Sequence, residues 1–229
     1  MRRWIISQIM FVVIVVVIGQ IGKSSFVDSG AMGLKTAEEA FSLESGVDYV
    51  FLDEDYDGFV KYEKSYIESV DTATLIVLGS PTGNIIQKHF SLAQEVKIEK
   101  VIKGDTSIVD TSAYIYGQYG FAINEDLHKE LTYYSVNDLM QPGHQYLMFL
   151  TPLELNDYLP RVGYRFIDSF FSHLDLSDDS TTITTIPLNE LKYTDVKGKE
   201  IFASSERMLD QLKHIKKEII GKYIPDRTN

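Results

Sequence analysis

A run of alternating acids is the segment whose residue types and spacing come closest to a known chemistry. Asp53, Asp55 and Asp57 alternate with other residues and are followed by Gly58. Calcium loops begin in this way, because their first, third and fifth positions supply oxygen ligands and a glycine permits the sharp turn. The twelfth position, which needs a bidentate acid, is Lys64. The pattern predicts a weak, degenerate calcium site at Asp53, Asp55 and Asp57, and no other cofactor. The alternative is a solvated acidic turn.

Tyrosine is the second residue type that could carry a function, with 14 copies in the chain. Tyr114, Tyr116 and Tyr119 lie close together in one segment. Tyrosine gives a large contact area at a low cost in side-chain entropy, which suits a binding surface. We therefore predict an exposed recognition face at Tyr114, Tyr116 and Tyr119. The alternative is that these rings pack on the outside of the fold, beneath a crossing segment.

The sequence contains no motif for nucleophilic or metal-dependent catalysis. Neither Gly-x-Ser-x-Gly nor His-Glu-x-x-His occurs, so the sequence predicts a non-enzymatic protein. The many carboxylates leave one alternative open, a cell-envelope hydrolase that uses a pair of acids. Five histidines are each predicted to be ordinary surface residues: His89, His128, His144, His173 and His214.

Charge and cysteine content exclude several classes of function. The net charge is −11, and the only charged residues among the first 23 are the bases Arg2, Arg3 and Lys23. The rest of the chain therefore carries 19 of the 22 bases against 33 acids, a net charge of −14. Such a domain repels the phosphate backbone, which argues against nucleic-acid binding. The absence of cysteine excludes disulfides, thiolate metal sites and a lipidated N-terminal cysteine.

The N-terminus carries a predicted membrane anchor. The 18-residue stretch 4–21 has only three polar members, and as a helix it would span about 27 Å, close to the hydrocarbon thickness. Arg2 and Arg3 place the tip, 1–3, in the cytoplasm. No small-x-small cleavage triplet lies near the end of the run, which favours a signal anchor over the alternative, a cleaved signal peptide. A Ser- and Gly-rich tether, 22–35, would hold the domain outside the cell.

The segment 36–73 is predicted to be a helical and loop lead-in that contains the acidic run. Thr36 to Glu39 has the form of a capping box, so a short helix should begin there. Val47 to Leu52 is predicted to be extended. Tyr62, Tyr66, Ile67 and Val70 recur at helical spacing and predict a second short helix.

The segment 74–186 changes to β patterns. The apolar parity of 95–102 shifts at Val101, as expected for a β-bulge. Tyr146 to Leu150 is apolar on both faces and predicts a central strand. Ser135 to Asp138 could start a helix within a long crossover, 121–142. The predicted strands of a closed or nearly closed antiparallel sheet lie near 74–79, 94–103, 107–116, 145–151 and 164–171, and a further strand is predicted at 181–186.

The C-terminal extension, 187–229, contains an amphipathic helix over 204–223. Its apolar stripe, including Met208 and Ile219, should pack against the barrel. Three lysines are expected on its remaining, exposed surface: Lys213, Lys216 and Lys217. The predicted fold is therefore mainly β with peripheral helices.

Three segments together resemble bacterial surface proteins with an OB-fold-like barrel of the netrin and tissue-inhibitor-of-metalloproteinases type. They are 73–79, 95–105 and 143–150, and the likeness extends over roughly 62–172. The resemblance implies a small OB-like antiparallel β-barrel. Metalloproteinase inhibition is not implied, because that activity uses a free N-terminal cysteine. We expect a single-pass membrane protein whose extracellular domain is a non-catalytic binding or inhibitory module, with a surface or envelope protein as a partner.

Overall fold

A computed structural model describes most of the chain beyond the N-terminal segments. The described residues are 47–49, 56–88, 91–123, 129–133, 137–153, 163–168, 171–177, 179–183, 195 and 198–225. The predicted anchor, tether and capping-box helix lie outside these residues. Within the described residues, no helix combines the length and apolar character needed to span a bilayer.

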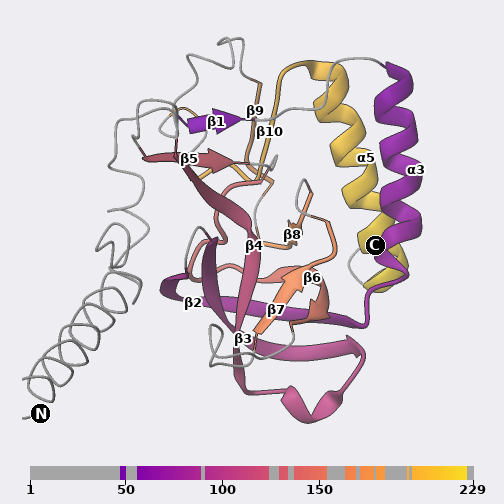
Figure 1. The fold of residues 1–229 in the computed structure, drawn as a ribbon. Helices are drawn as coiled ribbons and strands as arrows, with labels where there is room; N and C mark the ends of the chain where they lie inside the picture. Colours follow the sequence, from indigo (N-terminus) through magenta and orange to yellow (C-terminus); the bar gives the residue numbers. More distant parts are fainter. Residues whose placement is uncertain are drawn as a thin grey trace, which may run out of the picture. The chain divides into compact units, whose positions relative to one another are not determined.

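Five strands form a closed barrel (Figure 1). In their order around the ring they are β4 (Ser112–Ile123), β3 (Ser91–Lys103), β2 (Leu75–Lys88), β6 (Tyr146–Pro152) and β7 (Gly163–Phe166). The ring closes because β7 also pairs with β4, where Ile115 lies opposite Tyr164. That pair is parallel, whereas the other four are antiparallel. The predicted barrel is confirmed, but a wholly antiparallel sheet is wrong at the closing pair.

Strand β6 lies between the two main parts of the core. Tyr146, Met148 and Leu150 face the barrel interior, where they meet side chains of β2, β3 and β4. Leu147 and Phe149 point the other way, into a second apolar cluster. Because successive side chains of a strand alternate between faces, a strand buried on both sides must be apolar throughout. The prediction of a central strand here is confirmed.

Strand β3 contains the predicted bulge. Its register against β2 jumps by one residue, since Leu78 pairs with Lys100 whereas Gly79 pairs with Ile98. Glu99 is therefore the extra residue, which re-aims the side chains beyond it. Gly79 lies at this kink, where a Cβ atom would approach the carbonyl oxygen of Lys97 to 2.6 Å. Only glycine fits at this position without a shift of the neighbouring strand.

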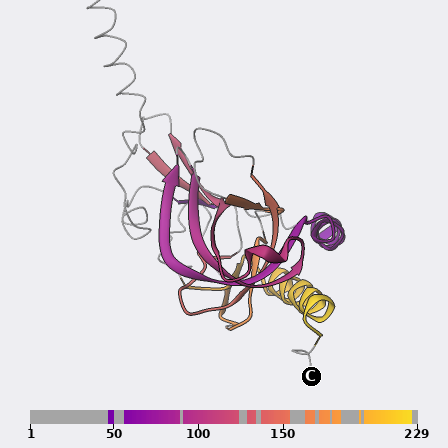
Figure 2. The ribbon, with the colours of Figure 1, turned by 90° about the horizontal axis from the view of Figure 1, so that it is seen from below.

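Two helices cover one outer face of the barrel. α3 (Tyr56–Val70) and α5 (Glu206–Tyr223) run side by side outside the ring, as Figure 2 shows along a second direction. Their apolar side chains join those of β2 and β6 in one cluster. Ser205 caps α5 by accepting a hydrogen bond from the backbone of Met208. Both helices confirm the periodicities seen in the sequence.

The crossover between β4 and β6 differs from the prediction. β5 (Lys129–Tyr133) forms a hairpin with β4. β1 (Val47–Tyr49) pairs with β5 in parallel. The following residues, 137–140, are not helical. Instead Met140 enters the barrel interior, and Gln94 exchanges hydrogen bonds of 2.8 and 3.0 Å with its backbone. A side chain thus satisfies the buried backbone groups that a helix would have paired internally.

The segments after the barrel form a smaller layer. The predicted strand 164–171 ends at Phe166, and the chain returns as β8 (His173–Asp175), antiparallel to β6. β9 (Thr181–Ile183) pairs in parallel with β10 (Ile201–Ala203) as a separate two-stranded sheet. The strand predicted near 181–186 therefore exists at 181–183 but does not belong to the barrel.

Candidate functional site

The predicted calcium loop does not have loop geometry where the structure describes it. Asp57 is the second residue of α3, and the chain is helical from Tyr56 through Lys64. The described part of a regular twelve-residue calcium loop over 53–64 is therefore helical from its fourth position onward. Asp53 and Asp55 lie outside the described residues. Within the part of the chain that the structure describes, no group of three or more His, Asp or Glu side chains could hold a metal ion.

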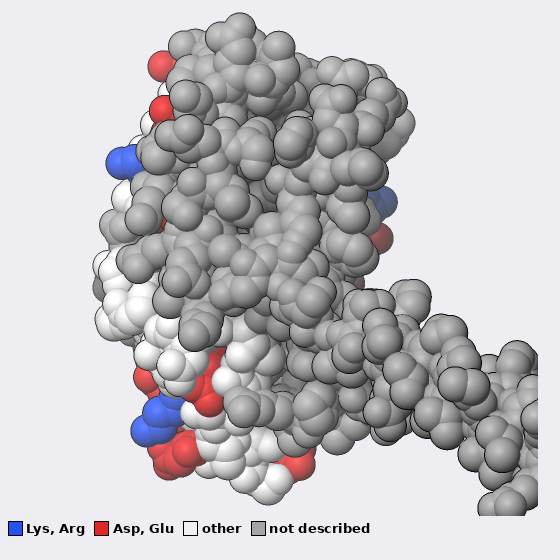
Figure 3. Space-filling model, turned by 60° about the vertical axis from the view of Figure 1, so that its left-hand side comes forward, with Lys and Arg blue, Asp and Glu red and all other residues white. Residues whose placement is uncertain are grey.

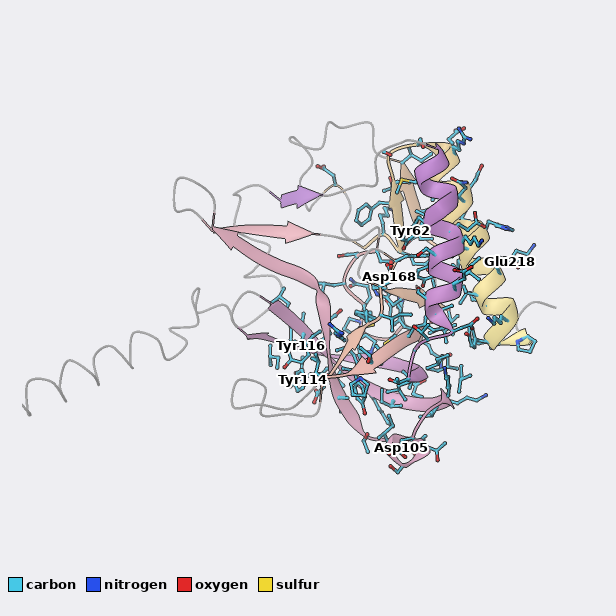
Figure 4. All side chains as sticks on the ribbon, turned by 45° about the vertical axis from the view of Figure 1, so that its right-hand side comes forward. Tyr62, Asp105, Tyr114, Tyr116, Asp168 and Glu218 are labelled. Atoms are coloured by element: carbon cyan, nitrogen blue, oxygen red, sulfur yellow. The ribbon has the colours of Figure 1, made fainter. Side chains whose placement is uncertain are left out.

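The predicted tyrosine face is buried at two of its three members. Tyr114 and Tyr116, both labelled in Figure 4, lie on strand β4. Each is 6% exposed, and both pack with Ala93 in a small apolar cluster. The structure thus agrees with the alternative, in which these rings pack against the fold. Tyr119 continues the same strand, where its backbone lies opposite Tyr133, and its side chain lies outside the described residues.

A buried ion pair links α5 to the strand layer. Lys216 Nζ lies 2.8 Å from Glu200 Oε2, and the two side chains are 9% and 2% exposed. The expectation that Lys216 lies on the exposed face of the helix was wrong. A signal for its burial was present in the sequence, because Leu212, Ile219 and Ile220 fall at positions i−4, i+3 and i+4 on the same helical face. The acid that makes burial tolerable comes from a different segment, which helical spacing cannot reveal.

Hydrogen bonds extend this pair into a polar network. The backbone of Asp175 donates to Glu200 Oε1 at 3.0 Å. The carboxylate of Asp175, 3% exposed, accepts a hydrogen bond from Nδ1 of His144 at 2.7 Å, and the His144 side chain is 32% exposed. Asp175 of β8 and Glu200, which directly precedes β10, thus connect an accessible imidazole to the buried ammonium of Lys216 on α5. The amide of Asn137 donates to the Glu200 carbonyl oxygen at 2.8 Å, which fixes the network to the segment that fills the barrel.

His173 lies in the core beside this network, where the sequence predicted a surface residue. Its side chain packs edge-on against Tyr146, with the ring centroids 5.0 Å apart, and it shares a hydrogen bond of 3.0 Å with Ser172. Burial, followed by the positive charge of Lys216, lowers the pKa of His173 to about 3. The imidazole is therefore neutral at ordinary pH.

Burial shifts the pKa of Glu200, the acid of the ion pair, in the opposite direction. Removal from water raises the pKa of Glu200 to about 7, although Lys216 and the backbone of Asp175 favour its charged form. The desolvation cost of a buried carboxylate thus outweighs the attraction of one ammonium. A carboxyl group that titrates near neutrality beside a lysine is an arrangement often found in functional sites.

The ion pair lies at an open pocket between α5 and the β9–β10 sheet. The pocket has a volume of about 520 Å³. Lys213, Lys216 and Lys217 of α5 line it together with two acids, Asp179 and Glu200. Thr181, Ile201 and Ile220 complete the lining. This size lies within the range of small-molecule sites, which also combine apolar walls with a few polar groups.

Three lysines around one pocket contrast with the acidic charge of the whole chain. On the described surface visible in Figure 3, acidic and basic side chains lie next to one another at the lower edge of the view. Lys97 and Asp110, for example, form an exposed ion pair with a separation of 3.4 Å. Among the described residues that line the pocket, by contrast, bases outnumber acids by three to two.

No protein-family model and no curated protein matches this sequence. The site must therefore be interpreted from its own geometry.

Proposed function

We propose that this chain is a non-catalytic binding module, anchored to the membrane by 4–21 and displayed outside the cell, whose ligand enters the pocket between α5 and the β9–β10 sheet. The observation that carries the proposal is the position of Lys216. Its side chain is nine-tenths buried, its ammonium is fixed by Glu200, and the residue lines an open pocket of about 520 Å³. A charge held in place before binding lowers the entropic cost of recognition.

The strand order supports an OB-like barrel as the scaffold of this module. β2, β3 and β4 form a meander, β6 pairs with β2, and β7 lies between β6 and β4. OB-folds are five-stranded barrels that serve as binding modules. The resemblance to bacterial surface proteins of the netrin and tissue-inhibitor-of-metalloproteinases type points to the same scaffold, and the anchor and acidic domain support display at the cell surface.

Filling the pocket tests the proposal. Thr181→Trp places a large ring in the pocket, whereas Thr182→Trp changes the next residue of β9, which points to the opposite face and does not line the pocket. Small molecules that co-purify with the full-length protein should be identified by mass spectrometry. We expect a compound that is retained by wild type and by Thr182→Trp but lost from Thr181→Trp. Equal retention by both variants, with unchanged melting temperatures, would reject the pocket as the binding site.

The alternative of an envelope hydrolase has one specific observation in its favour. In His144 and Asp175, a buried carboxylate holds an imidazole by its Nδ1 atom, so that Nε2 can accept a proton. His144→Gln would remove such a base without removing the lysine pocket. Hydrolysis of envelope polymers by wild type that Thr181→Trp retains and His144→Gln abolishes would favour the enzyme over the binding module.

A further inference from the structure

The two acids that contact Lys216 differ sharply in their surroundings. Glu200 Oε2 lies 2.8 Å from the ammonium, and its side chain is 2% exposed. Asp179 Oδ1 lies 2.6 Å from the same atom, but its side chain is 91% exposed. Glu200 is therefore the permanent partner, since leaving Lys216 would strand a buried carboxylate without its counter-ion. Asp179 can exchange Lys216 for water at little cost, because an ion pair with an exposed partner contributes little.

The charges around the pocket favour an anion in the place of Asp179. With Asp179 turned away into solvent, the described lining of the pocket holds the three lysines Lys213, Lys216 and Lys217 and one other acid, Glu200. Lys213 and Lys217 are exposed at this pocket, whereas Lys216 is fixed within it. An incoming anion would therefore meet one buried ammonium and two exposed ones. A carboxylate would repeat the contact that Asp179 already makes.

The remaining lining indicates the rest of the ligand. Ile220, which is half-buried, gives the pocket apolar surface beside the ammonium, whereas Ile201 also lines the pocket but is fully buried. The lysine side chains add methylene stems to such a surface while their charged ends remain near water. Inorganic anions such as phosphate or sulfate would leave these apolar contacts unused. A carboxylate attached to an apolar body would use both parts of the site.

We infer that the pocket binds an organic carboxylate with an apolar body, whose carboxylate replaces Asp179 on the ammonium of Lys216. This inference rests on the proposed function and names the ligand class of the same pocket. Asp179 then occupies the site in the free protein as an internal competitor for the ligand.

Three probes that differ only in their polar end test the ligand class. Full-length protein in lipid nanodiscs is titrated with 4-phenylbutanoate, 4-phenylbutan-1-ol and 4-phenylbutylamine, and the heat measured with empty nanodiscs is subtracted. We expect the carboxylate to bind at least about tenfold more tightly than the alcohol, because charge-assisted hydrogen bonds to an ammonium are stronger than neutral ones. The amine should show no saturable binding.

Two pairs of variants locate the site. Asp179→Asn removes the competitor and should tighten carboxylate binding by about two- to fivefold, the range expected for a weak exposed ion pair. Glu218→Gln makes the same change in net charge at an exposed position of α5 outside the pocket, labelled in Figure 4, and should leave the affinity unchanged. Lys213→Met should weaken carboxylate binding, whereas Lys64→Met on α3 should not.

The outcomes separate the inference from the proposed function. If the alcohol binds as tightly as the carboxylate, and Thr181→Trp abolishes both, the pocket is a binding site but the ligand class is wrong. If none of the three probes binds and no compound co-purifies, both proposals are overturned. If Asp179→Asn and Glu218→Gln tighten carboxylate binding equally, the effect comes from net charge and the displacement of Asp179 is rejected.

Discussion

At the scale of single residues, the buried pair of Lys216 and Glu200 determines how the C-terminal layer responds to mutation. Lys216→Met should lower the free energy of unfolding by about 3 kcal/mol at pH 8, because it leaves the Glu200 carboxylate buried without its counter-ion. Denaturant unfolding monitored by circular dichroism measures this loss. At pH 5 the loss should be smaller, since Glu200, with a pKa of about 7, can then take up a proton.

A double variant provides the control for this prediction. Glu200→Gln keeps the oxygen that accepts from the backbone of Asp175 but removes the charge. In Glu200→Gln/Lys216→Met no buried charge remains from the pair, so the double variant should be more stable than Lys216→Met alone at pH 8. Additive losses from the two substitutions would show that the pair does not act as a unit.

His173 and Glu200 should give opposite contributions to the pH dependence of stability. The folded-state pKa of His173, about 3, lies below its ordinary value of 6.5, so the unfolded chain binds the proton first and stability is lost as the pH falls below 6.5. Glu200 has a raised folded-state pKa of about 7 against 4.5, so its contribution grows as the pH falls from 7 to 4.5. Each contribution changes by about 1.4 kcal/mol per pH unit, and between pH 6.5 and 4.5 the two should cancel.

Removal of the histidine exposes the contribution of the acid. The free energy of unfolding of His173→Gln, minus that of wild type, should rise by about 2–3 kcal/mol when the pH is lowered from 6.5 to 4.5. The substitution removes the loss of stability caused by His173 and leaves the gain caused by Glu200. Urea unfolding of both proteins at the two pH values measures the difference, in which other titrating groups cancel. A stability difference that does not change with pH would contradict the low pKa of His173.

At the scale of elements, the bulge of β3 depends on the absence of a side chain at Gly79. Gly79→Ala would place a Cβ atom 2.6 Å from the carbonyl oxygen of Lys97 and 2.8 Å from Val96 Cγ1. Since backbone on the neighbouring strand must move, we expect a loss of about 1–3 kcal/mol of unfolding free energy. Gly143→Ala is the matched comparison for crowding, because a Cβ atom there meets nothing within 4 Å, although its φ of 88° adds backbone strain.

Elements that depend on consecutive residues could be predicted from the sequence. Features that depend on contacts between segments far apart in the chain could not. The stripe of α5, the two apolar faces of β6 and the parity change of β3 are properties of consecutive residues. The parallel pairing of β4 with β7 joins Tyr114 to Gly163, and no short pattern encodes it. The pocket was missed for the same reason, because the burial of Lys216 depends on an acid that another segment supplies.

At the scale of the whole molecule, the proposed anchor predicts how the full-length protein fractionates. The apolar stretch 4–21 should keep it with membranes after an alkaline carbonate wash, whereas a peripheral protein would be released. External protease should degrade the domain on intact protoplasts, since the positive-inside rule predicts that Arg2 and Arg3 keep the N-terminus in the cytoplasm. A soluble extracellular form that begins near Met32 would support the cleaved signal peptide instead.

The closing pair of the barrel and the late position of α5 also determine when this fold can be completed. A chain made from its N-terminus produces β2 before the other four barrel strands. The ring cannot close before Gly163, and α5, which joins α3 in covering Ile76 and Phe149, begins only at Glu206. At the usual rates of synthesis, on the order of ten seconds pass between the synthesis of β2 and the synthesis of α5. Throughout that interval an apolar strand is open to proteases and to other unfinished chains. Nascent chains that stop before α5 should therefore be degraded or aggregate, and a released chain gains protection only once α5 has formed.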